Sequence, residues 1–163
     1  GSGKTTLTLY HQKLKSYKII TDDKAYLYKN PNNSSIYCGG ILQPFDIVKT
    51  KDKFLIENKL LDFQKISWFE NEKYFIAQKF SRDIISAPAY LKTIVFPKIQ
   101  MPKNDIKSLT KTNALTELMK HSITPGLTLN LKEHFEILSA AVEQAEAFSV
   151  EIKDSFEFLK DIL

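Results

Sequence analysis

The chain begins with Gly1-Ser2-Gly3-Lys4-Thr5-Thr6, the second half of the phosphate-loop pattern G-x-x-x-x-G-K-[ST]. Glycines permit a tight turn in which backbone N–H groups point at phosphate oxygens. The Lys4 ammonium can reach the β- and γ-phosphates, and the Thr5 hydroxyl can bind Mg²⁺. The residues that follow, through Leu14, fit a helix whose positive end adds to an anion site. The pattern predicts a site for Mg²⁺-ATP or Mg²⁺-GTP formed by Gly1, Ser2, Gly3, Lys4, Thr5 and Thr6.

The first glycine of the pattern and the strand that should precede it are not in the sequence. We therefore expect a single domain, residues 1–163, that is truncated at its N-terminus. The alternative is that Gly1-Ser2-Gly3 is the remnant of an expression tag. The direct continuation into Lys-Thr-Thr-Leu favours the phosphate loop.

Two adjacent acids, Asp22 and Asp23, follow a β-rich run at residues 16–21 and lie eighteen and nineteen residues after Lys4. Ligands bind at the carboxyl ends of strands in α/β sheets, and a phosphate-loop enzyme needs a carboxylate there for Mg²⁺. One acid can bind the cation while the other accepts a proton from an attacking hydroxyl group. The alternative is a simple turn, since such residues often open loops. The spacing of one helix from the phosphate loop favours the site.

Arg82 is the only arginine in the chain. Its guanidinium can stabilise the charge on a transferred phosphoryl group, as an arginine finger does. An ion pair with the neighbouring Asp83, or with a carboxylate elsewhere, explains the residue equally well.

Composition narrows the class of protein. A hydrophobic content of 43% suits one domain with a sizeable core. The net charge of +4 comes from lysines spread along the whole chain, without a basic stripe between aromatic residues, so we expect no nucleic-acid partner. Cys38 is the only cysteine, which excludes a disulfide within the chain. No apolar run approaches the ~20 residues of a membrane span, and a cytoplasmic location is the expectation.

The middle of the chain is β-rich and its last third is mainly helical, which predicts a mixed α/β fold. The expected strands are residues 24–29, 36–38, 45–49, 53–57, 64–69, 74–79, 91–97 and 148–152. The expected helices are 107–121, 131–148 and 156–163, capped at Asp154-Ser155. Residues 30–35 predict a hairpin turn, and Gly39-Gly40 a bend or bulge, with close approach to a ligand as the alternative. His121 and His134 lack a second ligand at metal spacing and are expected on or near the surface.

The loop, the run Ile20-Thr21-Asp22-Asp23, the run Ala87–Pro97 and the closing segment Phe148–Leu163 together resemble one family. It comprises the C-terminal domain of HPr kinase/phosphorylase and its smaller relatives, which share a nucleotide-binding core with the phosphoenolpyruvate carboxykinases. The resemblance implies a magnesium-dependent kinase that phosphorylates a hydroxyl group of a protein or small molecule. It also implies a homo-oligomer.

The resemblance implies roles for individual residues. Asp22 would accept the proton, and Asp23 and Thr5 would bind Mg²⁺, although the order of the two acids stays open. The Arg- and Glu-rich signature segment of the full enzyme is missing, which puts HPr itself in doubt as a substrate. A regulatory module that binds a nucleotide without transferring phosphate is therefore the main alternative, and a degenerate scaffold is a third.

Overall fold

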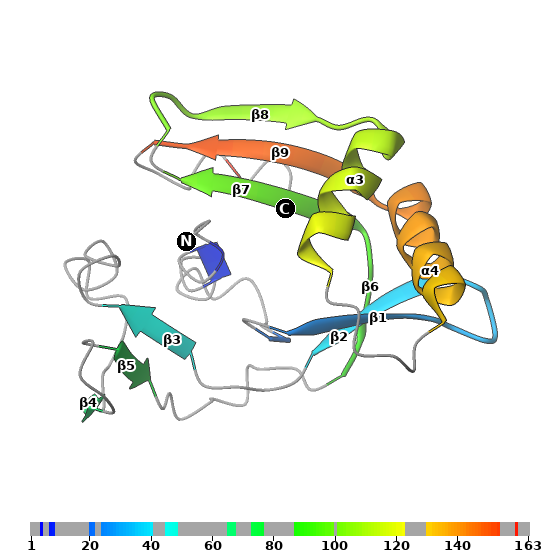
Figure 1. The fold of residues 1–163 in the computed structure, drawn as a ribbon, viewed down its shortest axis with the longest axis horizontal. Helices are drawn as coiled ribbons and strands as arrows, with labels where there is room; N and C mark the ends of the chain where they lie inside the picture. Colours follow the sequence, from blue (N-terminus) through cyan, green and yellow to red (C-terminus); the bar gives the residue numbers. More distant parts are fainter. Residues whose placement is uncertain are drawn as a thin grey trace. The chain divides into compact units, whose positions relative to one another are not determined.

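A computed structural model of the chain describes residues 4, 7–8, 20–21, 24–40, 45–48, 65–67, 73–76, 87–99, 101–122, 130–153 and 159. These residues belong to two compact units, Gly3–Ala25 with Gly39–Pro88, and Tyr26–Cys38 with Ala89–Leu163. The described part contains three sheets of three strands and the helices α3 and α4 (Figure 1), which confirms the mixed α/β class. Within these ranges no helix is long and apolar enough to cross a membrane.

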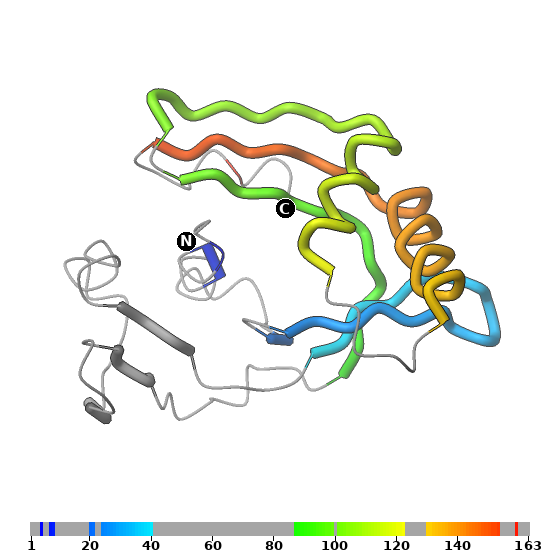
Figure 2. The backbone as a smooth tube through the Cα atoms, viewed as in Figure 1, coloured from blue at the N-terminus to red at the C-terminus, as the bar shows by residue number. Residues whose placement is uncertain are grey.

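The largest sheet of the second unit is built around a central strand. Strand β9 (Glu146–Ile152) runs parallel to β7 (Thr93–Ile99), with partners from Thr93↔Glu146 to Ile99↔Ile152. On its other side β9 is antiparallel to β8 (Asp105–Ser108). Figure 2 shows that the chain forms the two outer strands first and then, after the helices, inserts β9 between them. The central strand has Ala147, Val150 and Ile152 buried, whereas β7 is mostly half-buried.

The apolar run at residues 91–97 forms a strand as expected, but proline does not close it. Pro97 lies inside β7, opposite Val150. A proline lacks the N–H group of a β ladder and is tolerated where one side of the strand is unpaired. Since β7 has β9 as its only described neighbour, the sheet accommodates Pro97 at its edge.

Both helices form, and the sequence pattern is right about the end of the first and the start of the second but misplaces the start of the first and the end of the second. Helix α3 (Lys111–His121) begins after Thr110, whose hydroxyl accepts from Asn113 N at 3.3 Å. The residues before it that we expected to be helical, Lys107 and Ser108, belong to β8. Helix α4 (Leu131–Gln144) ends before β9, so residues 146–148 are strand rather than helix. Its N-cap is Asn130, whose side-chain oxygen accepts from Lys132 N at 3.1 Å.

The two helices and β9 share a core of small buried residues. Ala114 of α3, Val142 of α4 and Ala147 of β9 are 0%, 2% and 5% exposed. Small side chains let the helix backbones approach each other and the sheet closely. Larger side chains fill the edges of this cluster: Ile94, Phe96, Leu109, Leu115 and Leu118.

A hairpin forms the second sheet, as the sequence predicts. Strands β1 (Ala25–Lys29) and β2 (Ile36–Gly40) are neighbours, and β2 pairs in antiparallel fashion with the short β6 (Ala89–Tyr90). The side-chain oxygen of Asn30 accepts from Asn32 N at 2.9 Å, which stabilises the turn.

The first unit contains a sheet of order β3-β5-β4, formed by Phe45–Val48, Lys73–Ile76 and Lys65–Ser67. All of its described pairs are antiparallel. These strands confirm three expectations from the sequence pattern. The strand expected at 53–57 lies outside the described residues, as does the helix expected at 156–163 except for Leu159, which is buried and has a 3₁₀ conformation.

One glutamine at the end of α4 connects the helix to the hairpin sheet. Gln144 accepts from Ile36 N at 2.7 Å and donates to Ile36 O at 2.8 Å and to Leu91 O at 2.7 Å. Leu91 N also donates to Ile36 O, at 3.0 Å. The amide therefore satisfies backbone groups of β2 and of the residue after β6, which need partners where they are partly buried.

The same end of α4 receives a lysine from α3. The Lys111 ammonium donates to the carbonyl oxygens of Val142, Glu143 and Ala145, at 2.5, 3.0 and 3.1 Å. The last carbonyl groups of a helix lack intrahelical partners and carry partial negative charge, so a cation there is favourable. Lys111 lies in the first turn of its own helix, where a positive charge is unfavourable. The contact with the end of α4 offsets this unfavourable interaction.

We expect Gln144→Glu to reduce the free energy of unfolding at neutral pH by about 1–3 kcal/mol, because a carboxylate cannot donate to two carbonyl oxygens. The protonated carboxyl can donate, so its pKa in the folded state should be raised. The new carboxyl then contributes to the free energy of unfolding below its unfolded-state pKa of about 4.3. This contribution is lost as the pH rises through its higher folded-state pKa. The deficit in free energy of unfolding relative to the wild type should therefore shrink in acid, as measured by urea unfolding between neutral and acidic pH.

Gln144→Ala is the control, since its deficit should not depend on pH. An equal deficit for Gln144→Glu at both pH values would contradict the hydrogen bonds assigned to Gln144.

We expect Lys111→Met to lower the free energy of unfolding by about 1–2 kcal/mol, because three carbonyl groups lose a charged donor. The matched control is Lys120→Met in the same helix. Lys120 makes an exposed ion pair with Glu117 at 2.7 Å, which adds little in water. Chemical denaturation of both variants tests the difference, and equal effects would argue against the capping role.

Candidate functional site

Of the six expected phosphate-loop residues, the structure describes Lys4. Lys4, Leu7 and Thr8 are helical, and the Thr8 hydroxyl donates to the Lys4 carbonyl at 3.0 Å, the i to i−4 bond of a helical residue. The Lys4 side chain is exposed. Leu7 and Thr8 agree with the helix expected after the glycines, whose other residues lie outside the described residues. The other expected nucleotide-binding residues lie outside the described residues: Gly1, Ser2, Gly3, Thr5 and Thr6.

The acidic pair Asp22 and Asp23 also lies outside the described residues, but its neighbours do not. Ile20 lies in a bend and Thr21 in irregular backbone, so the strand expected to run through Thr21 is wrong at these two positions. Lys24 follows the pair and directly precedes β1. The acids are thus bounded by irregular backbone before them and the start of the hairpin after them.

Gly40 brings the end of β2 against the residue before the acidic pair. A Cβ atom built on Gly40 would overlap with Thr21 Cβ and Cγ2 and would lie 3.1 Å from Ile20 Cγ2. Gly39-Gly40 is therefore the end of a strand rather than a separate bend, and the close approach is to Thr21. The missing side chain allows the segment that leads to Asp22 to pack against β2.

The remaining candidate residues that the structure describes, His121, His134 and Cys38, form no common cluster. Arg82 lies outside the described residues. His121 is exposed and stacks on Phe96 with ring centroids 6.4 Å apart, whereas the half-buried His134 has Nε2 3.2 Å from Ser122 Oγ. Both histidines lie on or near the surface, as expected. Within the described ranges there is no group of three or more His, Cys, Asp or Glu able to bind a metal. Burial raises the pKa of the Cys38 thiol, which opposes a role as a nucleophile.

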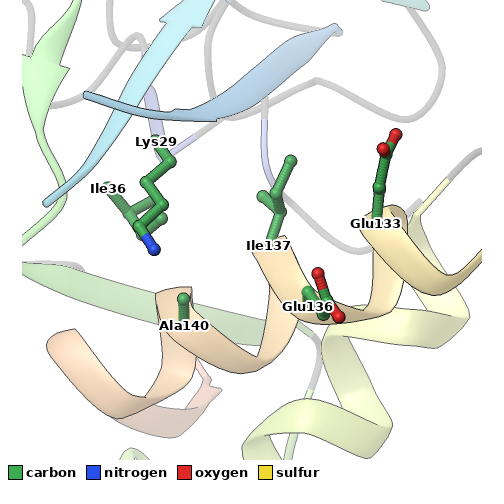
Figure 3. A pocket seen from close by; sticks show the side chains of 6 residues that line it. All are labelled: Lys29, Ile36, Glu133, Glu136, Ile137 and Ala140. Carbon is green, nitrogen blue, oxygen red and sulfur yellow. The ribbon is translucent and has the colours of Figure 1, made fainter. Parts of the chain in front are cut away.

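A small hollow lies between the hairpin and α4, which the sequence pattern did not predict. Figure 3 shows Lys29 and Ile36 of the strands pointing toward the helix, with Ile137 of α4 pointing back at them. Glu133, Glu136 and Ala140 complete its lining. Its volume of about 230 Å³ is below the roughly 300–1,000 Å³ of most small-molecule sites, so we assign it no ligand.

Comparisons with protein-family models, with curated proteins and with solved structures give no match for this chain. The chemistry of the residues themselves must therefore support any functional assignment.

We expect Gly40→Ala to lower the free energy of unfolding by about 1–3 kcal/mol, because the added methyl group overlaps with the Thr21 side chain and forces backbone or side-chain shifts. Thermal unfolding of the variant measures the loss. The double variant Gly40→Ala with Thr21→Gly should recover part of it, since the overlapping atoms are removed. If the double variant loses as much free energy of unfolding as the two single variants together, the packing of Gly40 against Thr21 is contradicted.

Proposed function

We propose that the chain binds Mg²⁺-ATP or Mg²⁺-GTP at Gly1–Thr6 and transfers the γ-phosphoryl group to a hydroxyl group. The observation that supports this most directly is the Gly-Ser-Gly-Lys-Thr-Thr sequence running into a helix at Lys4, with the Lys4 side chain exposed. Backbone amides at such a helix start, with an ammonium beside them, suit a triphosphate. The proposed fold is a phosphate-loop core of the HPr-kinase and phosphoenolpyruvate-carboxykinase type.

The proposed chemistry assigns one task to each residue. The amides of Gly1–Thr6 and the Lys4 ammonium orient the triphosphate and neutralise its charge. Mg²⁺, when bound by Thr5 and Asp23, supplies further charge neutralisation at the β- and γ-phosphates. Asp22 accepts the proton of the attacking hydroxyl as its oxygen bonds to the γ-phosphorus and the bond to the β-phosphate oxygen breaks. Arg82 stabilises the charge of the transferred group.

The phosphoacceptor class is a serine or threonine of a protein, or a hydroxyl of a small molecule. A cytoplasmic location and a homo-oligomeric state belong to the same proposal, on the strength of the resemblance.

We expect Lys4→Ala to abolish detectable phosphotransfer and to weaken nucleotide binding, because the phosphates lose their cation. Asp22→Asn should lower kcat by about 10²–10⁴-fold with little loss of nucleotide affinity, because only proton acceptance is lost. Release of labelled ADP and thermal shift with Mg²⁺-ATP measure the two effects. Lys132→Ala, on the exposed face of α4 at a side-chain exposure of 80%, is the matched control. Full turnover by Asp22→Asn would remove Asp22 from this role.

The second candidate is a nucleotide-binding regulatory module, favoured by the missing Arg- and Glu-rich segment. It predicts a thermal shift with Mg²⁺-ATP that Lys4→Ala removes, together with no labelled product from any hydroxyl substrate. No thermal shift in the wild type would contradict both candidates and leave a scaffold.

A further inference from the structure

Four tyrosines form a continuous row across the β1-β2-β6 sheet. The ring centroids are 6.2 Å apart for Tyr26 and Tyr28, 5.9 Å for Tyr28 and Tyr37, and 5.8 Å for Tyr37 and Tyr90. Tyr37 and Tyr90 are also direct partners in the antiparallel pair of β2 with β6. These separations are typical of interacting aromatic rings. We call this group the tyrosine row.

The tyrosine row lies on the sheet face that points away from α4. Successive side chains of a strand point to opposite faces, and Lys29 and Ile36 point at α4 (Figure 3). Their neighbours Tyr28 and Tyr37 must therefore point the other way. The two ends of the row remain open, since Tyr26 is 47% and Tyr90 52% exposed. Three strands thus contribute to one aromatic surface, in which the rings of Tyr37 and Tyr90 meet edge to face.

Two exposed lysines flank the strands that carry the row. Lys24 directly precedes β1, and Lys92 follows Tyr90 of β6 by two residues. Lys29 lies in β1 but points at α4, and Lys98 belongs to β7 of another sheet. The three strands themselves contain no aspartate or glutamate, whereas Asp22 and Asp23 come just before Lys24.

We propose that the tyrosine row binds a single-stranded nucleic acid. Each base has a flat π-face that can stack on an exposed ring, and the adjacent lysines can neutralise phosphates, which is how single strands are bound without sequence preference. A duplex hides the faces of its bases and cannot use the row in this way. The proposal departs from the expectation of no nucleic-acid partner, because strand pairing gathers tyrosines from three separate segments into one row, which the order of residues along the chain does not show. It is independent of the proposed phosphotransfer.

Fluorescence anisotropy with fluorescein-labelled oligo(dT) and oligo(U) of about 12 nucleotides tests the proposal on the whole chain. The oligonucleotides carry a 5′-hydroxyl, so that no terminal phosphate can occupy the N-terminal loop. Tyr26→Ala and Tyr90→Ala should each raise Kd by about 5- to 150-fold, the range expected for losing one base stack. Tyr26→Phe should bind as the wild type does, because stacking needs the ring and not the hydroxyl. Phe135→Ala is the control, since Phe135 is 48% exposed on α4 and lies outside the row.

A salt titration tests the contribution of Lys92 to binding separately from that of the tyrosines. Lys92→Gln should reduce the slope of log K against log salt concentration by about 0.7, the value for one phosphate contact to a single strand. Lys132→Gln makes the same change of net charge on α4 and should leave the slope unchanged. Equal slopes for both variants would place the phosphates elsewhere and overturn the role of Lys92.

The proposal is overturned if the wild type fails to bind either oligonucleotide, or if both tyrosine-to-alanine variants fold and bind normally. Binding of a neutral oligosaccharide in place of the oligonucleotides, lost in Tyr90→Ala, would assign the row to sugars and equally overturn it. Photo-crosslinking of a 5-bromouracil oligonucleotide to the wild type covers the case in which a variant does not fold. Crosslinks should map to the tyrosine row, and crosslinks confined to other segments would contradict it.

Discussion

The contacts at the C-terminal turn of α4 hold the helices and sheets of the second unit together. There the ammonium of Lys111 binds three carbonyl groups of the helix end, and the amide of Gln144 binds the backbone of β2 and of the residue after β6. Directly after this turn the chain enters β9, whose first residue donates from Glu146 N to Lys92 O at 3.0 Å. One helix end thus orders α3, the hairpin sheet and the central strand together. A helix end buried in this way needs such partners, because its carbonyl groups otherwise lose their hydrogen bonds to water.

This arrangement also determines which face of the hairpin sheet is open. Gln144 binds Ile36, and Ile36 and Lys29 point at α4, so one face of the sheet is occupied by the helix. The alternation of side chains then directs Tyr28 and Tyr37 to the opposite face. An open aromatic face therefore follows from the docking of α4, and the proposed nucleic-acid surface follows from that face. The proposed phosphate-binding site depends on different residues, at the start of the chain.

Sequence patterns predicted local elements well and their ends poorly. The hairpin at residues 24–38 was predicted because its turn residues are Asn, Pro and Ser, and in the turn the side chains of Asn30 and Asn33 accept from backbone amides two residues further on. The start of α3 was wrong because Lys107 and Ser108 fit the helical pattern yet pair with β9, a contact that depends on residues some forty positions away. The end of α4 was wrong for the same reason, since residues 146–148 fit the helical pattern yet pair with β7, some fifty positions away. Of the candidate site, helical backbone is found at Lys4, Leu7 and Thr8, and the strand through Thr21 is not found at Ile20 and Thr21.

The sequence by itself determined the mixed α/β class, the hairpin and the two helices, because turn residues, caps and apolar spacing act over a few neighbouring positions. It also provided the loop pattern on which the proposed phosphotransfer stands. Only the tertiary structure decided that Lys111 and Gln144 meet at one helix end, that Gly40 packs on Thr21, and that four tyrosines from three strands form one row. These contacts join residues far apart in the chain, and strand pairing and helix docking, rather than local preference, bring them together.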